Sequence, residues 1–188
     1  MEFFSKFTEY MVQCNRLNEK GFQEWLFLPG MLFHESEKWW GKGGFRPSPH
    51  EGVDICFYKN NSGQQITLDE TAEIPVVYDG EIVKIGKDFL GKSVYIRHNN
   101  ICDADGRNLY TIYGHTKPYD TIYPGTLVSE GDVIGKISDG NKRINLLSHL
   151  HISMAWIPAS CPCETLDWKM LGDPGRVSLL NPLEVIRH

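Results

Sequence analysis

SHLHISMAW, residues 148–156, places two histidines two positions apart in a run where apolar and other residues alternate. Side chains at positions i and i+2 share one face of a β-strand, whereas on a helix they diverge. The stretch therefore predicts a strand that turns Leu150 and Ile152 toward a core and His149 and His151 toward a common site on the other face. A pair of surface histidines without a shared role is the alternative interpretation of this motif alone.

Further short runs rich in β-branched and aromatic residues, separated by turn residues, precede this stretch. They predict strands at 53–58, 74–78, 81–85, 93–98, 109–113 and 133–137. So many short strands in about a hundred residues indicate an all-β core, built as a sheet or a barrel. Asp79-Gly80 stands between two of the runs and predicts that they pair as a hairpin.

The N-terminal part of the chain has a different pattern. From Phe4 to about Leu28, apolar residues recur at steps of three and four without a proline, which predicts an amphipathic helix on the outside of the main domain. A passage rich in glycine and proline follows. We therefore divide the chain into an N-terminal helical segment and loop, 1–43, and a main domain, 44–188. Residues 158–182 are expected to form loops with one short closing element.

Composition and charge narrow the classes of function. The 188 residues are 41% hydrophobic and 23% charged, which suits one main globular domain. A net charge of −5 gives no basic surface for a phosphate backbone, so we expect no nucleic acid partner. No apolar run is long enough to cross a membrane, and the charged first 20 residues do not resemble a secretory signal. The chain is then either cytosolic, or its export signal lies outside this sequence.

The five cysteines do not form the pattern of a disulfide framework. Cys161 and Cys163 are the only close pair, and their spacing, with one proline between them, fits a zinc knuckle poorly. We interpret the cysteines as small apolar residues. The role of this pair stays open.

Two other stretches add residues of the kind that bind zinc. In HEGVD, residues 50–54, the preceding prolines and the internal glycine argue against a helix, so His50 is expected in a loop that enters the strand carrying Asp54. His115 ends another predicted strand and, taken alone, is more simply a solvated turn residue. A catalytic zinc usually has three His or Asp/Glu ligands and one open position. The chain offers one such carboxylate and four histidines, enough for a mononuclear zinc hydrolase.

Several motifs in chain order carry a resemblance to a known family. They are FRP at 45–47, HEGVDI at 50–55, YTIYGH at 110–115, GDVIG at 131–135, HLH at 149–151 and NPL at 181–183. In this order they resemble the lysostaphin-type zinc metalloendopeptidases, the peptidoglycan hydrolases of peptidase family M23. The similarity of the motifs before NPL runs from about Gly44 to Trp156, and NPL is similar to the Asn-Pro and short apolar element with which the family tends to end.

The resemblance implies an antiparallel β-sheet or β-sandwich fold with one zinc ion in a groove. By motif position it implies that His50, Asp54 and His151 bind the metal and that His115 and His149 are catalytic. Zinc lowers the pKa of bound water toward about 7, and the two remaining imidazoles are suited to move protons or to stabilise an oxyanion.

The function implied is hydrolysis of peptide bonds in bacterial peptidoglycan cross-links or stem peptides, in the cell envelope or outside the cell. Two alternatives stay open: a non-catalytic or regulatory peptidoglycan-binding module of the same fold, and a cytosolic peptidase that acts on another substrate. The sequence does not decide the scissile bond, the oligomeric state or whether the N-terminal segment is inhibitory.

Four further residues are given structural interpretations. His98 ends a predicted strand and is expected to have a structural role, and Glu51 is expected at the surface. Trp39 and Trp40 are expected to pack the N-terminal helix onto the sheet.

Overall fold

Two antiparallel sheets make up the fold in the computed structural model, which describes residues 5–186. The larger sheet has nine strands, in the order β12-β11-β8-β7-β6-β9, with β2 joined to β11 and with β10 joined to β8 and β5. A three-stranded sheet has the order β1-β3-β4. The prediction of an all-β, antiparallel core is confirmed.

The larger sheet contains most of the strands predicted from sequence. Its strands are β2 (Val53–Ile55), β5 (Glu73–Pro75), β6 (Gly80–Lys87), β7 (Lys92–Cys102), β8 (Asn108–Pro118), β9 (Leu127–Val128), β10 (Val133–Ile137), β11 (Leu150–Ile157) and β12 (Ser178–Leu180). The small sheet consists of β1 (Phe22–Leu26), β3 (Phe57–Asn60) and β4 (Gln65–Thr67). The helices are α1 (Phe7–Cys14), α2 (Trp168–Leu171) and α3 (Leu183–Ile186), with 3₁₀ turns η1 (Lys142–Ile144) and η2 (Cys163–Thr165).

The N-terminal segment differs from its prediction. The helix α1 ends at Cys14, and residues predicted to continue it form β1, which pairs with β3. Arg16, with φ 52°, turns the chain out of the helix. Phe4, the predicted start of the helix, lies outside the described residues. Phe7 and Met11 are fully buried and one helical turn apart, so α1 joins the core of the larger sheet.

The predicted hairpin at Asp79-Gly80 is wrong. The strand before it, β5, pairs with β10, and the strand after it, β6, pairs with β7 and β9. Gly80 is needed for close approach to a neighbouring strand, because a Cβ there would lie 2.7 Å from the carbonyl oxygen of Arg97.

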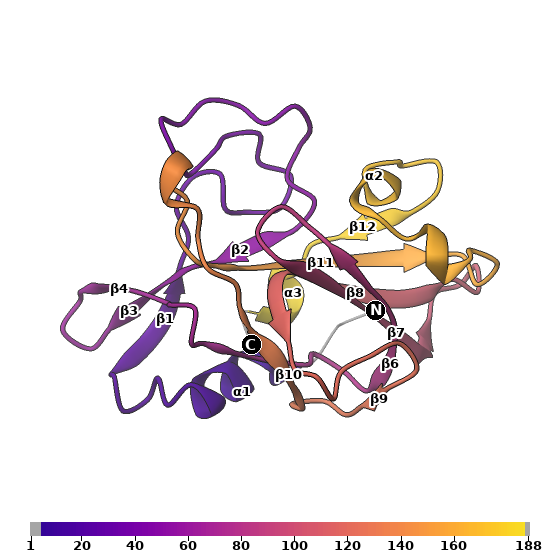
Figure 1. The fold of residues 1–188 in the computed structure, drawn as a ribbon, viewed down its shortest axis with the longest axis horizontal. Coiled ribbons are helices and arrows are strands. Elements are labelled where there is room, and N and C mark those ends of the chain that lie inside the picture. The colour runs from indigo at the N-terminus through magenta and orange to yellow at the C-terminus, as the bar shows by residue number, and fades with distance from the viewer. Residues whose placement is uncertain (1–4, 187–188) are drawn as a thin grey trace.

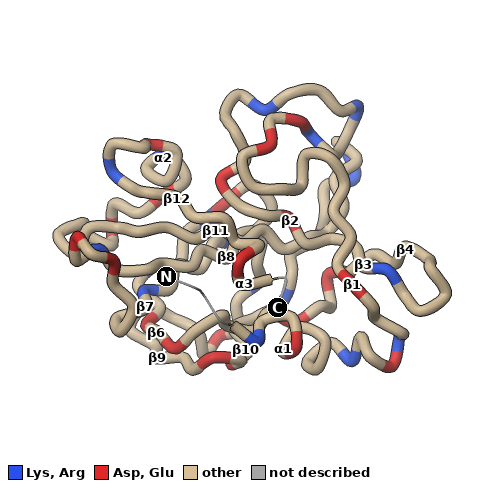
Figure 2. The backbone as a smooth tube through the Cα atoms, turned by 180° about the vertical axis from the view of Figure 1, so that it is seen from behind, with Lys and Arg blue, Asp and Glu red and all other residues tan. Residues whose placement is uncertain are grey.

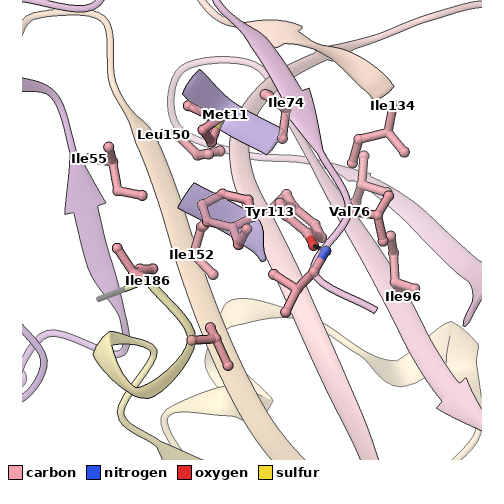
Figure 3. Packing of buried hydrophobic residues seen from close by; sticks show 14 of the residues in the cluster. Met11, Ile55, Ile74, Val76, Ile96, Tyr113, Ile134, Leu150, Ile152 and Ile186 are labelled. Atoms are coloured by element: carbon pink, nitrogen blue, oxygen red, sulfur yellow. Dashed lines mark hydrogen bonds between the residues drawn. The ribbon is translucent and has the colours of Figure 1, made fainter. Parts of the chain in front are cut away.

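Both faces of the larger sheet are covered. On one face Leu150, Ile152 and Tyr113 share one apolar cluster with Met11 of α1 and Ile186 of α3 (Figure 3). On the other face a second apolar cluster joins β7, β8 and β11 to the C-terminal segment through Leu166, Met170, Leu171 and Val177. The C-terminal segment is thus part of the packed structure. This second face also carries the candidate site.

Two segments rise above the sheet on the side of the candidate site. Figure 1 shows the loop between β1 and β2 and the segment with α2 and β12 on the same side of β8 and β11, and the opposite view in Figure 2 agrees. Figure 2 also shows acidic and basic residues interspersed along the chain. Among the described residues no helix is long and apolar enough to cross a bilayer.

Candidate metal centre and active site

Strand pairing around His151 assembles the candidate site. On one edge of β11, His151 lies opposite Asp54 of β2, and on the other edge it lies opposite Gly114 of β8. This register brings His115, the next residue of β8, near the same place. Its ring centroid lies 5.9 Å from that of His151.

Gly52 permits the approach of the HEGVD segment to β11. A Cβ at this position would overlap the carbonyl oxygen of Ile152 and would lie 2.7 Å from Ser153 Oγ. A larger residue would therefore push His50 and Asp54 away from His151.

Three potential ligand atoms meet in the interior. His50 Nε2 lies 3.1 Å from Asp54 Oδ1 and 3.0 Å from His151 Nδ1, and the last two atoms are 2.8 Å apart. All three residues are at most 5% exposed. Among the described residues, these three form a group that could hold a metal ion.

Each of the two imidazoles makes a polar contact through its other ring nitrogen, and this contact orients the nitrogen that faces the interior. His50 Nδ1 lies 3.1 Å from the carbonyl oxygen of Leu32, which can only accept, so Nδ1 carries the hydrogen and Nε2 presents a lone pair. His151 Nε2 lies 2.8 Å from Ser153 Oγ, which leaves Nδ1 for the interior when Nε2 carries the hydrogen.

The other carboxylate oxygen of Asp54 has its own donors. Trp39 Nε1 donates to Asp54 Oδ2 at 2.7 Å, and Arg46 Nη2 approaches the same oxygen at 3.3 Å. Oδ1 is therefore the oxygen that faces the imidazoles of His50 and His151.

The arrangement fits a zinc ion. Three lone-pair atoms held about 3 Å apart repel one another unless a proton or cation lies between them. Tetrahedral ligands about 2.0–2.1 Å from zinc lie roughly 3.3 Å apart, close to the observed separations. Two neutral imidazoles and one carboxylate also form a common donor set of catalytic zinc sites.

Burial and charge set the protonation states that metal binding requires. Burial acts to raise the pKa of Asp54, but the neighbouring His50 and His149 and the close contact with His151 hold it well below its ordinary value. Burial lowers the pKa of His151 to about 3 against the opposing effect of Asp54. At neutral pH the pair is therefore an ionised carboxylate and a neutral imidazole.

His149 presents an unprotonated nitrogen to the same region. Its Nδ1 lies 2.8 Å from the carbonyl oxygen of Leu147, which again assigns the hydrogen to Nδ1. Its Nε2 lies 3.8 Å from Asp54 Oδ1, too far for a hydrogen bond. Burial lowers the pKa of His149 to about 4, so the ring is neutral and able to accept a proton at Nε2.

His115 lies across from His149, with ring centroids 4.8 Å apart. Its side chain is 16% exposed and its φ is 60°, in the left-handed region. The backbone N–H of His115 donates to Asp88 Oδ2 at 2.6 Å, and Nδ1 lies 3.3 Å from Asp88 Oδ1. Burial acts to raise the pKa of Asp88, but the contacts with His115 and Ser93 lower it below the ordinary value.

A cleft of about 240 Å³ opens onto these residues. It is lined by residues from β2, β8, β11 and α2, from the β1–β2 and β6–β7 loops and from the loop before β11, namely Trp40, Arg46, Glu51, Asp54, Asp88, Phe89, His115, Leu146, His149, His151 and Trp168. The residues predicted as ligands and as catalytic thus lie together at one cleft, with His50 buried behind it.

Sequence reasoning missed the residues that surround this group. Trp39 and Trp40 do not pack α1 onto the sheet. Trp39 contacts Asp54 and also lies edge-on to His149 at 5.0 Å, and Trp40 lines the cleft beneath the guanidinium of Arg46. A Trp-Trp pair shortly before the HEGVD segment was the available signal.

The interpretations of His98 and Glu51 made from the sequence can be compared with their positions in the structure. His98 is buried away from the cleft, with Nδ1 2.9 Å from the carbonyl oxygen of Asp79 and Nε2 2.7 Å from Thr111 Oγ1, as its structural interpretation predicted. Glu51 is partly buried and lines the cleft. Asp88 and Trp168 had no signal in the sequence.

Several solved structures are similar to the chain at a distance. A solution structure of lysostaphin shares 20% identity over 64% of this chain and 43% of its own, with a TM-score of 0.41. A structure of the antimicrobial peptidase lysostaphin from Staphylococcus simulans shares 15% identity over 89% of this chain and 55% of its own, with a TM-score of 0.46. A catalytic-domain variant of the prophage-encoded M23 protein EnpA from Enterococcus faecalis shares 21% identity over 67% and 82%, with a TM-score of 0.42. The chain thus spans about half the length of lysostaphin, and these likenesses are too distant to support an argument about activity.

A sequence comparison is decisive for the family. No curated protein matches the chain. The sequence model of Peptidase family M23 matches residues 59–160, which is more than half of the chain and contains His115, His149 and His151. His50 and Asp54 lie before the matched segment, and Trp168 lies after it. The resemblance seen in the motifs is confirmed, and the chain belongs to peptidase family M23.

Proposed function

We propose that this protein is a zinc-dependent metalloendopeptidase that hydrolyses peptide bonds in bacterial peptidoglycan cross-links or stem peptides. The observation that carries the proposal is the triangle of His50 Nε2, Asp54 Oδ1 and His151 Nδ1 beside a cleft that two further imidazoles line. Membership of a peptidase family supports the reaction class. In this proposal the protein binds one zinc ion and acts in the cell envelope or outside the cell.

The metal would supply Lewis acidity and a lowered pKa for water in the cleft. The three ligands would hold it, and Trp39 and Arg46 would keep Asp54 ionised and correctly turned. His149, unprotonated at Nε2, would accept a proton from the attacking water.

His115 has a different task in this proposal. Its ring centroid lies 4.8 Å from that of His149 and 5.9 Å from that of His151, and its side chain is partly exposed. A hydrogen bond or proton from this imidazole would stabilise the oxyanion or protonate the departing amine.

The experiment combines metal analysis with digestion of purified peptidoglycan. We expect about one zinc per chain, and release of new amino termini that stops with a chelator and returns with added zinc. His151→Ala should lose both zinc and cleavage, whereas His149→Ala should keep zinc and lose cleavage. His34→Asn, at an exposed position outside this cleft, is the control for removing a histidine.

Other outcomes distinguish the alternatives. Stoichiometric zinc in a variant with alanine at positions 50, 54 and 151 would refute the ligand assignment. Binding of peptidoglycan without chelator-sensitive cleavage would favour a regulatory module. Cleavage of peptides but not of peptidoglycan would favour a different substrate, and mass spectrometry of the fragments identifies the bond.

A further inference from the structure

Asp88 is an acidic side chain of the cleft whose role the assignment of ligands and catalytic histidines leaves unexplained. It begins the loop between β6 and β7, and its side chain is only 1% exposed. Oδ1 accepts from the backbone N–H groups of Leu90 at 2.9 Å and Gly91 at 2.7 Å, while Oδ2 accepts from Ser93 Oγ at 2.8 Å. The carboxylate is therefore held by three donors in its own loop and the following strand.

The same carboxylate contacts His115 at two places. Oδ2 accepts the His115 backbone N–H at 2.6 Å, and Oδ1 lies 3.3 Å from His115 Nδ1. A residue other than glycine with φ of 60° pays a conformational cost and persists where its surroundings hold it. Asp88 holds the His115 backbone by this hydrogen bond, and its Oδ1 lies within ion-pair distance of Nδ1, a buried ring nitrogen that has no hydrogen-bond partner among the described residues.

A chain of hydrogen bonds links Asp88 to the C-terminal segment. Trp168, the first residue of α2, donates from Nε1 to Ser93 Oγ at 3.1 Å, and Ser93 Oγ donates to Asp88 Oδ2. The Trp168 ring also lies edge-on to His151, with centroids 5.0 Å apart. Trp168 lies beyond the segment that the family model matches, so this chain of contacts depends on a part of the protein outside that match.

We infer that Asp88 is a positioning residue that sets the orientation of the His115 imidazole, and that Ser93 and Trp168 hold Asp88 in place. The inference rests on the proposed function, since it assigns a purpose to the orientation of His115. If the only role of Asp88 were to stabilise its loop, the hydrogen bonds from Leu90, Gly91 and Ser93 would be sufficient. The two contacts with His115 are additional.

The test compares Asp88→Asn with Asp103→Asn. Asp103 also accepts backbone N–H groups in a tight turn, from Asp105 at 3.0 Å and Arg107 at 2.9 Å, but lies outside the residues that line the cleft. For Asp88→Asn we expect kcat on peptidoglycan fragments to fall by about 10- to 100-fold, the loss typical when a group orienting a functional histidine is removed. KM should change by less than about twofold and zinc content should not change. Asp103→Asn should leave kcat, KM and zinc content as in the wild type.

A spectroscopic measurement separates this inference from the proposed function. In zinc-loaded protein labelled with ¹⁵N in the histidine rings, Asp88→Asn should move the ring signals of His115 and leave those of His98 unchanged. If the wild type cleaves nothing, the proposed function fails, yet this measurement still tests the contact. Unchanged His115 signals, a kcat within twofold of the wild type, or a zinc loss that parallels the activity loss would each overturn the inference.

A double-mutant cycle tests the supporting residues. Ser93→Ala removes the hydroxyl between Asp88 and Trp168, and Trp168→Phe keeps a ring beside His151 but removes the indole N–H. Because both changes break one chain of hydrogen bonds, we expect the double variant to lose no more kcat than the worse single variant. Losses that multiply would show that Trp168 acts by another route and would overturn this part of the inference.

Discussion

Trp39 provides the most direct test of how the protein prepares its candidate metal centre. The indole Nε1–H donates to Asp54 Oδ2 at 2.7 Å, and Asp54 is 2% exposed. Trp39→Phe removes this donor and keeps most of the ring that packs against Phe57 and His149. The change therefore isolates one hydrogen bond to a buried carboxylate.

The expected magnitude follows from the bond that is lost. A hydrogen bond to a charged group contributes about 1.5–3 kcal/mol. Arg46 Nη2, at 3.3 Å from the same oxygen, remains and partly compensates. Since about 1.4 kcal/mol corresponds to a factor of ten in binding, we expect the dissociation constant for zinc to rise by roughly 10- to 100-fold.

The assay is competition for zinc against a chromophoric chelator at fixed pH and salt. Trp25→Phe is the matched control, because Trp25 Nε1 donates to Thr8 Oγ1 at 2.8 Å and is outside the cleft. We expect that control to bind zinc like the wild type. A zinc affinity of Trp39→Phe within twofold of the wild type, with the fold intact by circular dichroism, would refute the reasoning.

Three further predictions concern stability and substrate binding. Burial lowers the pKa of His98 to about 4, so below pH about 6.5 this imidazole binds more protons in the unfolded chain than in the folded protein. As the pH drops from 6.5 to 4, His98 should contribute about 3 kcal/mol to the loss of stability of the zinc-free protein, beside the contributions of His149 and His151, whose pKa values burial also lowers. His98→Gln should remove this share and make the pH dependence measured in urea titrations less steep. Gly52→Ala forces a Cβ against the Ile152 carbonyl, so it should lower the free energy of unfolding by at least about 1–3 kcal/mol and weaken zinc binding. Gly86→Ala is the control, because the nearest atom to its Cβ would be 3.9 Å away, and it should change neither property. Equal denaturation midpoints for the two variants would contradict this prediction. Phe89 lines the cleft and is 65% exposed, so Phe89→Ala should raise KM severalfold with little change in unfolding free energy, and an unchanged KM would exclude it from substrate binding.

The strands could be predicted because their signal is local. The run at 133–137 forms β10 with the predicted bounds, and the stretch at 149–156 forms β11 displaced by one residue. Successive side chains of a strand point to opposite faces, so a strand with one face on the core shows alternating apolar residues. This pattern is visible from neighbouring residues alone. Leu150 and Ile152 lie in the core below the sheet, and His151 lies on the opposite face.

The errors came where a local pattern has two structural meanings. Asp79-Gly80 has the composition of a hairpin turn, but Gly80 is required by the close approach of β7. Apolar spacing beyond Cys14 suited a helix, but pairing with β3 stabilises a strand at Phe22–Leu26. Tertiary contacts decided both cases against the local preference.

The sequence by itself determined the alternating strands, the family and the residue types available for a metal site. Only the tertiary structure decided which of these residues meet, because His50 and His151 are 101 positions apart and are joined by the register of β2 and β8 on β11. It also decided which residues support them. Trp39, Asp88 and Trp168 come from three separate segments and share no spacing with the histidines, so only the packing of those segments brings Trp39 to Asp54, Asp88 to His115 and Trp168 to Ser93.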